Sequence, residues 1–258
     1  MRIRWFGSIS VALVLTIALV LTGCDGGGGD EQITVASDIA YPPFEFEKKG
    51  KPVGFDIDLM REIGKRAGFT PEFQNVTFDG IIPGLGNNLY DAGASAFTIT
   101  EAREKKVDFS DPYFNADQSL MVQSGSPIKS VDDIGDGIVG VQLGTTGELK
   151  AKEFEQQGKI TGEVRTFDTI TEAFSALENG QIEAVINDFP ISAYFAKTGG
   201  GSLEVVQTIP TGEQYGIAFP QDSDLLEPTN KALEEIKKDG TYAEIYEKWF
   251  GEKPEEIP

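Results

Sequence analysis

Short apolar runs alternate with amphipathic stretches along the chain from Ile33 to Phe250. Apolar side chains spaced three or four positions apart predict helices, and short runs rich in Val, Ile, Ala and Phe predict strands. Strands that alternate with helices favour parallel α/β sheets. The predicted strands are 33–36, 73–76, 92–96, 119–122, 138–142, 164–166, 182–187 and 215–219, and the predicted helices are 55–67, 78–87, 100–106, 148–156, 169–178, 223–238 and 241–250.

One unit of this pattern occurs twice. A helix, a turn and a strand run from Leu85 to Ala96, and the same succession runs at the same spacing from Leu177 to Asp188. Any helix–turn–strand unit has this general form, so the likeness can be generic. A true repeat would instead mean two similar α/β lobes whose strands end at equivalent places.

Residues that directly follow the predicted strands are the first candidates for a binding site. Ligands of open α/β sheets bind beyond the carboxyl ends of the strands. Asp38 and Tyr41 follow the first strand, and the segment 95–98 follows the third. In the second half of the chain, the segment 142–147 and Asp188 occupy the corresponding places.

Arg103 lies in the first turn of a short predicted helix that Thr100 can cap. A cation in a first turn opposes the helix dipole, so helix stability does not explain this arginine. A guanidinium can hold a carboxylate through two parallel hydrogen bonds. The alternative is a surface arginine that pairs with Glu101 or Glu104.

Small residues open the helix that follows the strand 138–142. The segment 144–147, with sequence GTTG, would let backbone N–H groups approach an anion at a helix start, although no lysine of a phosphate-binding loop follows. A plain turn with a threonine cap is the alternative. Asp188 is either a charged binding group or the N-cap of the next helix.

Aromatic residues gather in the early loops, where most are expected to join the core. Tyr41 and Phe78 lie nearer the strand ends and could wall a pocket or face a cation. Asp38 and Glu45 could supply negative charge beside them. For Glu45, a plain surface acid is an equal alternative.

The first thirty residues have a different character. Arg2 and Arg4 precede an uncharged, apolar run over 5–21, and small residues lead to Cys24. This pattern is typical of a secretory signal, and the sequence LTGC resembles a bacterial lipobox, in which the cysteine is lipidated. We expect a signal peptide over 1–23, then the lipidated cysteine and a flexible tether over 24–30. An uncleaved membrane anchor is the alternative, for which the run is slightly short.

The composition excludes several classes of function. The 258 residues include 22 Lys and Arg, 42 Asp and Glu, no histidine and one cysteine, and the formal charge is −20. Without histidine the chain has no Ser-His-Asp triad and no histidine-rich metal site, and one cysteine allows no internal disulfide. The acidic excess argues against a basic face for nucleic acid. We expect no metal, no cofactor and no nucleic-acid partner.

Taken in order, several segments resemble the extracellular solute-binding proteins of polar amino-acid ABC importers, the glutamine, histidine and arginine type. Each segment is a weak signal alone, but the ordered series from about 33 to 251 is specific. The segments are VASD and YPPFEF within 35–46, GFDIDL at 54–59, FDGIIPGL at 78–85, TITEAR at 98–103, VDFSDPY at 107–113, VQLGTTG at 141–147, QYGIAF at 214–219, and DGTY with WF within 239–250.

The resemblance implies an α/β fold of the type II periplasmic-binding-protein kind. Two parallel-sheet lobes would be joined by two crossover strands and would close on ligand by a hinge. Lobe 1 would comprise 31–116 plus 213–258, and lobe 2 would comprise 117–212.

The resemblance also implies roles for individual residues. Arg103 would hold the α-carboxylate of an amino acid with Thr98 and the amide of Thr146. Asp188 would hold the α-ammonium group with the Ser95 carbonyl and the Thr98 hydroxyl. Tyr41 and Phe78 would sandwich the ligand side chain, and its tip would face Asp38, Glu45 and Gln142. The full implied set is Asp38, Tyr41, Glu45, Phe78, Ser95, Ala96, Thr98, Arg103, Gln142, Thr145, Thr146 and Asp188.

One departure from the family bears on the ligand. Some glutamine binders of this family have Lys at the position of Gln142 and His at that of Asn187. Asp38 and Glu45 without a nearby cation fit a cationic side chain, which would also gain cation–π attraction between two rings. The expected ligand is arginine or another basic amino acid, then glutamine, with glutamate last.

The expected function is therefore non-catalytic capture of an amino acid outside the cytoplasm, for delivery to an ABC importer permease. We expect a monomer anchored to the membrane through lipid on Cys24, in the periplasm or at the outer cell surface. A dehydratase-like enzyme on the same fold is an alternative of another class, for which Glu45 is a conceivable acid. A sensor domain is a third class.

Overall fold

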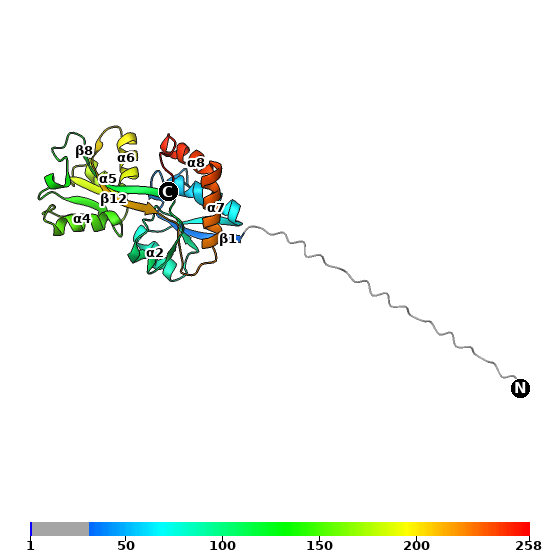
Figure 1. The fold of residues 1–258 in the computed structure, drawn as a ribbon. Helices are drawn as coiled ribbons and strands as arrows, with labels where there is room; N and C mark the ends of the chain where they lie inside the picture. Colours follow the sequence, from blue (N-terminus) through cyan, green and yellow to red (C-terminus); the bar gives the residue numbers. More distant parts are fainter. Residues whose placement is uncertain (2–30) are drawn as a thin grey trace.

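The computed structural model describes Met1 and residues 31–258, so the expected signal peptide, Cys24 and the tether lie outside the described residues. Figure 1 shows two lobes, each built on one sheet. The chain enters the second lobe along β8 (Phe114–Gln123) and returns along β12 (Leu203–Tyr215), and these two strands pair antiparallel. The expected two-lobed α/β fold is confirmed.

The first sheet has the strand order β5-β1-β6-β13-β7. β1 (Glu31–Ser37) lies parallel to β5 (Phe69–Asn75) and to β6 (Ala92–Gly93). β13 (Ala218–Phe219) pairs antiparallel with β6 and with β7 (Asp108–Phe109). The sheet is mixed rather than parallel throughout, because β13 belongs to the returning part of the chain.

The second sheet has the order β10-β9-β11-β8-β12. β9 (Val139–Gln142) lies parallel to β10 (Val164–Phe167) and to β11 (Ala184–Asp188), and β8 and β12 add antiparallel strands. The parallel part of each sheet therefore has the same order, with the earliest strand in the middle. The repeated unit in the sequence corresponds to this shared topology.

A small antiparallel sheet lies between β1 and α1. It consists of β2 (Ala40–Tyr41), β3 (Glu45–Lys48) and β4 (Lys51–Val53). The hydrophobic pattern did not predict it, because strands this short show little alternation.

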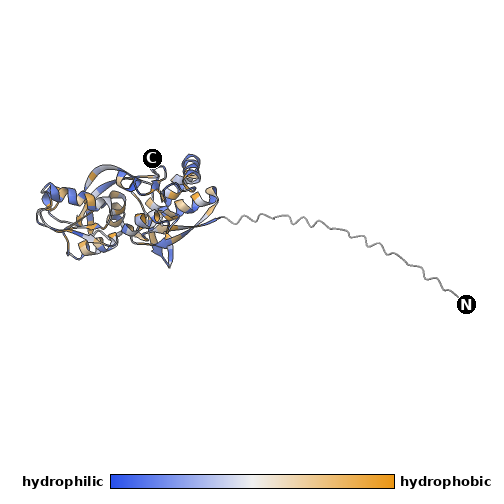
Figure 2. Ribbon diagram, turned by 90° about the horizontal axis from the view of Figure 1, so that it is seen from below, coloured by the Kyte–Doolittle hydropathy of each residue, from blue (hydrophilic) through white to orange (hydrophobic). Residues whose placement is uncertain are grey.

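Helices accompany both sheets. The first lobe carries α1 (Phe55–Ala67), α2 (Phe78–Gly86), α3 (Glu101–Glu104), α7 (Leu226–Asp239) and α8 (Thr241–Phe250), and the second carries a 3-10 turn η1 (Val131–Asp133), α4 (Thr146–Gln156), α5 (Ile170–Glu178) and α6 (Phe189–Thr198). Hydrophobic and hydrophilic residues alternate along these helices (Figure 2). Such amphipathic helices bury one side against the sheets.

Several helix ends follow the signals in the sequence. α1 spans the predicted range and ends at Gly68, whose φ of 87° is left-handed. The side chain of Thr100 accepts a hydrogen bond from the backbone N–H of Arg103, as expected of the α3 cap. α8 also spans its predicted range. The sequence pattern did not delimit α6.

Several predicted strands differ in extent from the structure, and two of them are much shorter in it. The strand expected over 92–96 pairs only over β6, because Ala96 has a φ of 46° and its N–H donates to the Asp56 carboxylate. The strand expected over 215–219 breaks at Gly216, where the chain passes from the second sheet to the first. The pattern also missed most of β12, because Pro210 and Gly212 are typical of a loop. The strand accommodates them in an irregularity between Ile209 and Glu213.

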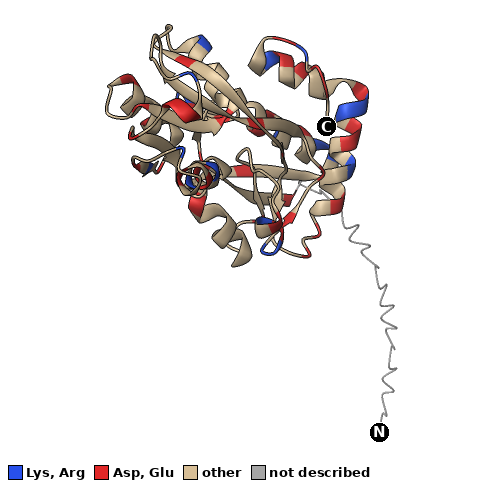
Figure 3. Cartoon of the chain, turned by 60° about the vertical axis from the view of Figure 1, so that its left-hand side comes forward, with Lys and Arg blue, Asp and Glu red and all other residues tan. Residues whose placement is uncertain are grey.

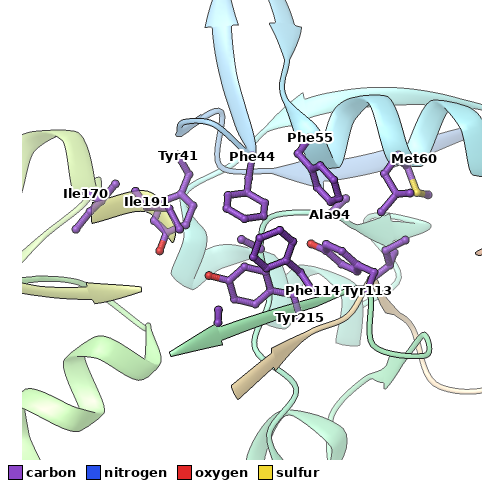
Figure 4. Packing of buried hydrophobic residues seen from close by; sticks show 14 of the residues in the cluster. Tyr41, Phe44, Phe55, Met60, Ala94, Tyr113, Phe114, Ile170, Ile191 and Tyr215 are labelled. Carbon is purple, nitrogen blue, oxygen red and sulfur yellow. The ribbon is translucent and has the colours of Figure 1, made fainter. Parts of the chain in front are cut away.

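An aromatic cluster fills the core beside β8 and β12. Figure 4 shows Phe44, Phe55, Phe114 and Tyr215 packed together, with Tyr41 beside residues of the second lobe. The Phe44 ring meets the rings of Phe55, Phe114 and Tyr215 edge-on, at centroid distances of 5.8, 4.9 and 5.4 Å. Such pairs add stability beyond the area they bury. The cluster therefore braces the place where the chain crosses between the lobes.

Acidic residues, red in Figure 3, lie along elements of both lobes. Within residues 31–258, no helix combines the length and the apolar character that crossing a membrane requires.

Candidate ligand-binding site

A narrow cavity lies between the two lobes. Every residue that lines it belongs to the set implied by the sequence. These residues are Tyr41, Phe78, Ala96, Thr98, Arg103, Gln142, Thr145, Thr146 and Asp188. The first five come from β2, α2, α3 and the loop before α3, and the others come from the ends of β9 and β11 and the start of α4.

Arg103 reaches across the cavity from α3. Its Nη1 donates to the Thr98 carbonyl at 2.7 Å, and its Nη2 donates to the Gly144 carbonyl in the second lobe at 3.1 Å. Within the described residues it forms no ion pair, so the alternative of pairing with Glu101 or Glu104 is wrong. Burial lowers the pKa of this guanidinium. The charge is held by neutral oxygens and can still take a carboxylate.

Asp188 is the last residue of β11 and is 5% exposed. It stands at the N-cap position of α6, but its side chain makes no capping hydrogen bond. Instead the carboxylate accepts hydrogen bonds from the hydroxyls of Tyr41, at 3.0 Å, and Tyr215, and from the Gln118 amide. Burial raises the pKa of Asp188, and these donors oppose that rise. The carboxylate thus faces the cavity rather than the helix.

Asp38 and Gln142 meet across the cleft. The Gln142 Nε2 donates to the Asp38 carboxylate at 2.5 Å and to the Asp168 carbonyl at 3.1 Å. The Gln142 Oε1 is buried and has no partner among the described residues. Burial raises the pKa of Asp38 to about 6. Gln142 lines the cavity, and the Asp38 carboxylate lies directly behind it. The unused amide oxygen and the negative charge behind it suit a ligand rich in donors.

The aromatic residues of the set do not have equivalent surroundings. The Phe78 ring stacks on Phe97 with a centroid distance of 4.6 Å, and the Arg103 guanidinium lies 5.3 Å from the centre of the Phe78 ring. Tyr41 bonds through its hydroxyl to Asn187 and Asp188. Both line the cavity, as expected of residues that flank a ligand side chain.

Glu45, Ser95 and Asp38 belong to the implied set but do not line the cavity. Ser95 donates through its hydroxyl to Glu45 at 3.0 Å and accepts from the backbone N–H of Asp38 at 3.0 Å. Glu45 is fully buried, so the alternative of a plain surface acid is wrong. The side chains of Ser95 and Glu45 thus lie behind the cavity wall.

At the start of α4, the threonine cap is confirmed, and the approach of backbone N–H groups to an anion stays a prediction. The Thr145 hydroxyl accepts a hydrogen bond from the Glu148 N–H at 3.1 Å, so Thr145 is a helix cap. Thr146 lines the cavity, and its hydroxyl lies 3.3 Å from that of Thr98 in the other lobe. Capping and a place in the cavity wall are compatible because they use neighbouring residues.

Sequence reasoning missed four residues that support the cavity: Gln118, Asn187, Glu213 and Tyr215. The Gln118 amide nitrogen donates to Asp188, to Thr146 and, at 2.9 Å, to Glu213. A polar residue directly before the apolar strand 119–122 was a usable signal for Gln118. Glu213 carried no such signal, because the irregularity in β12 decides where its side chain points.

The described residues contain no group of three or more His, Cys, Asp and Glu side chains arranged to hold a metal ion.

Comparisons with known proteins identify the family of the chain. The model of the bacterial extracellular solute-binding proteins, family 3, matches residues 33–252. A probable histidine-binding protein of Neisseria gonorrhoeae is 33% identical over 95% of this chain and 96% of its own length. The arginine-binding extracellular protein ArtP of Bacillus subtilis is 33% identical over 94% of this chain and 97% of its own.

Among solved structures, an ancestral arginine-binding protein bound to arginine superposes with a TM-score of 0.80 at 45% identity. The match covers 85% of this chain and 98% of that one. Together with the family match over most of the sequence, this shows that the chain belongs to the bacterial extracellular solute-binding proteins of family 3.

Proposed function

We propose that this protein captures a free amino acid with a basic side chain, arginine first, outside the cytoplasm and delivers it to an ABC importer. One observation carries the proposal: Arg103 from the first lobe and Asp188 from the second face one buried cavity with opposite charges. The names of the relatives, which bind arginine or histidine, support the same class of ligand.

In the proposed complex, each charged group of the amino acid meets an opposite charge. Arg103, Thr98 and Thr146 hold the α-carboxylate, and Asp188 holds the α-ammonium group with help from the Ser95 carbonyl. A zwitterion buried without such partners would lose far more hydration energy than it regained.

Selectivity is proposed to arise at the other end of the cavity. The free Gln142 oxygen there can accept hydrogen bonds, and the Asp38 carboxylate behind Gln142 adds negative charge, to which Asp79 and Glu172 contribute further negative potential. A guanidinium or ammonium group satisfies this acceptor and offsets this negative charge. Glutamine is the second choice, because its amide offers fewer donors and no charge. A glutamate carboxylate would be repelled.

The proposed division into lobes is 31–116 plus 213–258 and 117–212. Its boundaries fall within β8 and β12, so these paired strands act as the hinge. Ligand contacts from both lobes are complete only when the lobes are together, so ligand stabilises the closed state. The closed form is what the importer permease would recognise.

We further propose that the protein is a monomer without catalytic activity, anchored to the membrane by lipid on Cys24. Its family is extracellular, which supports a location outside the cytoplasm. Labelling with a radioactive fatty acid, compared between wild type and Cys24→Ser, tests the anchor. Label in both proteins would count against lipidation at Cys24.

A thermal-shift screen tests the ligand. Residues 31–258 are unfolded and refolded to strip bound amino acid, then heated with each of the twenty amino acids. A ligand at one hundred times its dissociation constant adds about 2.7 kcal/mol of stability. A shift with arginine or lysine supports the proposal. A shift with glutamine alone would overturn the basic ligand, and no shift with any amino acid would overturn amino-acid capture.

The enzyme alternative is tested with the same sample. Hydroxylated cyclic acids of the prephenate class are incubated with the protein, and loss of water is followed by absorbance. Turnover would replace the transport proposal, while arginine binding without turnover supports it.

A further inference from the structure

Two carboxyl groups lie side by side in the core behind the cavity. Glu45 begins β3 and Asp56 lies in the first turn of α1. Their exposed fractions are 0% and 2%, and their side chains are within hydrogen-bonding reach of each other. Proposed ligand contacts leave this pair unused, and two carboxylates at this depth would repel each other strongly.

The backbone forces this proximity. Phe55 and Asp56 donate their N–H groups to the carbonyls of Pro43 and Phe44 at 2.9 and 3.0 Å, so the start of α1 is tied to the chain just before Glu45. Gly54 allows the approach: a Cβ there would lie 1.9 Å from the Phe44 carbonyl oxygen, and its φ is 141°. The two carboxyl groups are therefore neighbours by construction of the fold.

The hydrogen bonds of the pair are unequal and incomplete. One Asp56 oxygen accepts from the Tyr113 hydroxyl at 2.7 Å and from the Ala96 N–H at 2.8 Å, whereas Glu45 accepts only from the Ser95 hydroxyl. The second oxygen of each group, Glu45 Oε2 and Asp56 Oδ1, is buried and has no donor among the described residues. Two ionised carboxylates can only accept, so neither can satisfy the other.

We infer that Glu45 is a protonated acid that donates a hydrogen bond to an ionised Asp56, and that it positions the cavity wall instead of contacting ligand. The proton satisfies both orphaned oxygens at once. Asp56 is the ionised partner because it has two further donors and lies at a helix N-terminus, where negative charge is favoured. Through Ser95, the acid fixes the backbone of Asp38.

The surroundings of Glu45 agree with a neutral acid. The groups that face it are Asp56 of α1, Asp38 after β1, Tyr41 of β2 and Tyr113 before β8, together with the Ser95 hydroxyl. None of these is a cation. Burial is the main cause that raises the pKa of Glu45 well above its ordinary value of 4.5, and the charge of Asp56 raises it further.

The test is Glu45→Gln, whose amide keeps an acceptor for Ser95 and a donor for Asp56 but cannot ionise. Glu45 keeps its proton in the folded protein and loses it on unfolding once the pH exceeds 4.5, so wild-type stability falls with rising pH relative to the variant. The equilibrium constant for unfolding of wild type, divided by that of Glu45→Gln, should grow by up to about tenfold per pH unit until Glu45 ionises in the folded state. Glu47→Gln, exposed on the same strand, should show no such divergence.

Two further readouts keep the inference falsifiable. In wild type labelled with carbon-13 glutamate, one carboxyl carbon should retain the chemical shift of the protonated acid at neutral pH. The absence of such a signal would overturn the inference even if the variant did not fold.

Arginine affinity, a readout that rests on the proposed function, should change by less than about threefold in Glu45→Gln. A tenfold loss with no change in the pH profile would instead make Glu45 an ionised ligand contact. If wild type binds no arginine, the stability and spectroscopic results still decide the matter.

Discussion

Arg103 and Asp188 are each held by neutral partners and not by each other. Arg103 donates to two backbone carbonyls, and Asp188 accepts from two tyrosine hydroxyls and an amide. Neutral hydrogen bonds orient a charge without cancelling it. Both groups therefore keep a full charge for a zwitterion, whereas a direct ion pair between them would compete with ligand.

Asp188→Asn is expected to lower arginine affinity at least tenfold, which is about 1.4 kcal/mol. The asparagine oxygen can still accept from Tyr41, but the ligand ammonium would be left in a buried site without its counter-charge. Isothermal titration calorimetry measures the change. Asp136→Asn, exposed in the same lobe, is the control and should bind like wild type. Equal affinity in both variants would remove Asp188 from the site.

The pKa of Asp38, raised by burial to about 6, predicts that arginine affinity depends on pH. Arginine should bind the ionised form, so its affinity should fall as the pH drops below 6, by up to about tenfold per pH unit. A cationic ligand lowers the pKa of Asp38 in the complex, and this linkage also makes arginine affinity fall as the pH drops. Affinity should level off at higher pH.

Asp38→Asn is the control for this prediction. It should bind arginine more weakly at neutral pH and lose most of the pH dependence. Arginine affinities measured between pH 5 and 8 in both proteins check it, and an unchanged slope in Asp38→Asn would assign the titration to another group.

At this scale the sequence predicted the cavity wall well, because residues such as Tyr41, Gln142 and Asp188 lie at the ends of strands. The depth of a side chain was harder to predict. Glu45 lies in a loop motif that gives no sign of its contact with Asp56, since that contact depends on the start of α1 docking against 43–45. Glu213 depends likewise on a local irregularity in β12.

Among the elements, the turn between β9 and α4 packs closely against α2 of the other lobe. Gly144 has a φ of 81°, and a Cβ at this position would lie 3.0 Å from the Cβ of Asp79 on α2. Its carbonyl also receives the Arg103 hydrogen bond. This glycine is therefore needed for the lobes to meet and not only for the turn.

Gly144→Ala is expected to weaken arginine binding by about tenfold or more, because the added methyl group opposes closure against α2. Gly125→Ala is a matched control: its φ is 82°, but a Cβ there meets nothing within 4 Å. Both variants should lose similar stability without ligand, as measured by chemical unfolding. An equal effect on affinity would show that backbone strain, and not the contact between lobes, is responsible.

Helices with strong periodicity in their own residues could be predicted, whereas strands that depend on pairing with another strand could not. α1 and α8 carry complete signals in their own residues, from apolar spacing to the glycine that ends them. β12 contains Pro210 and Gly212 and exists because β8 pairs with it along most of its length. The strands of the small sheet are likewise defined by one another.

For the whole molecule, the opposed charges and the hinge together predict a large closing movement. The aromatic cluster around Phe44 and Phe114 lies at the crossing strands, so the lobes can rotate about it while it stays packed. The contacts of Arg103 with Gly144 and of Tyr41 with Asp188 lie across the cleft and would separate. Ligand adds its own links between Arg103 and Asp188, which shifts the population towards closure.

Small-angle X-ray scattering of residues 31–258 should therefore show a smaller radius of gyration with arginine than after the ligand is stripped. A compact chain of this length has a radius of gyration of about 17 Å, and the open form should exceed it. Gly125→Ala should contract like wild type. Gly144→Ala should contract less at the same ligand saturation, because its obstacle lies between the lobes and not in the cavity. If Gly144→Ala contracts as much as wild type, Gly144 does not control closure. If none of the three proteins contracts, they bind ligand without a hinge movement.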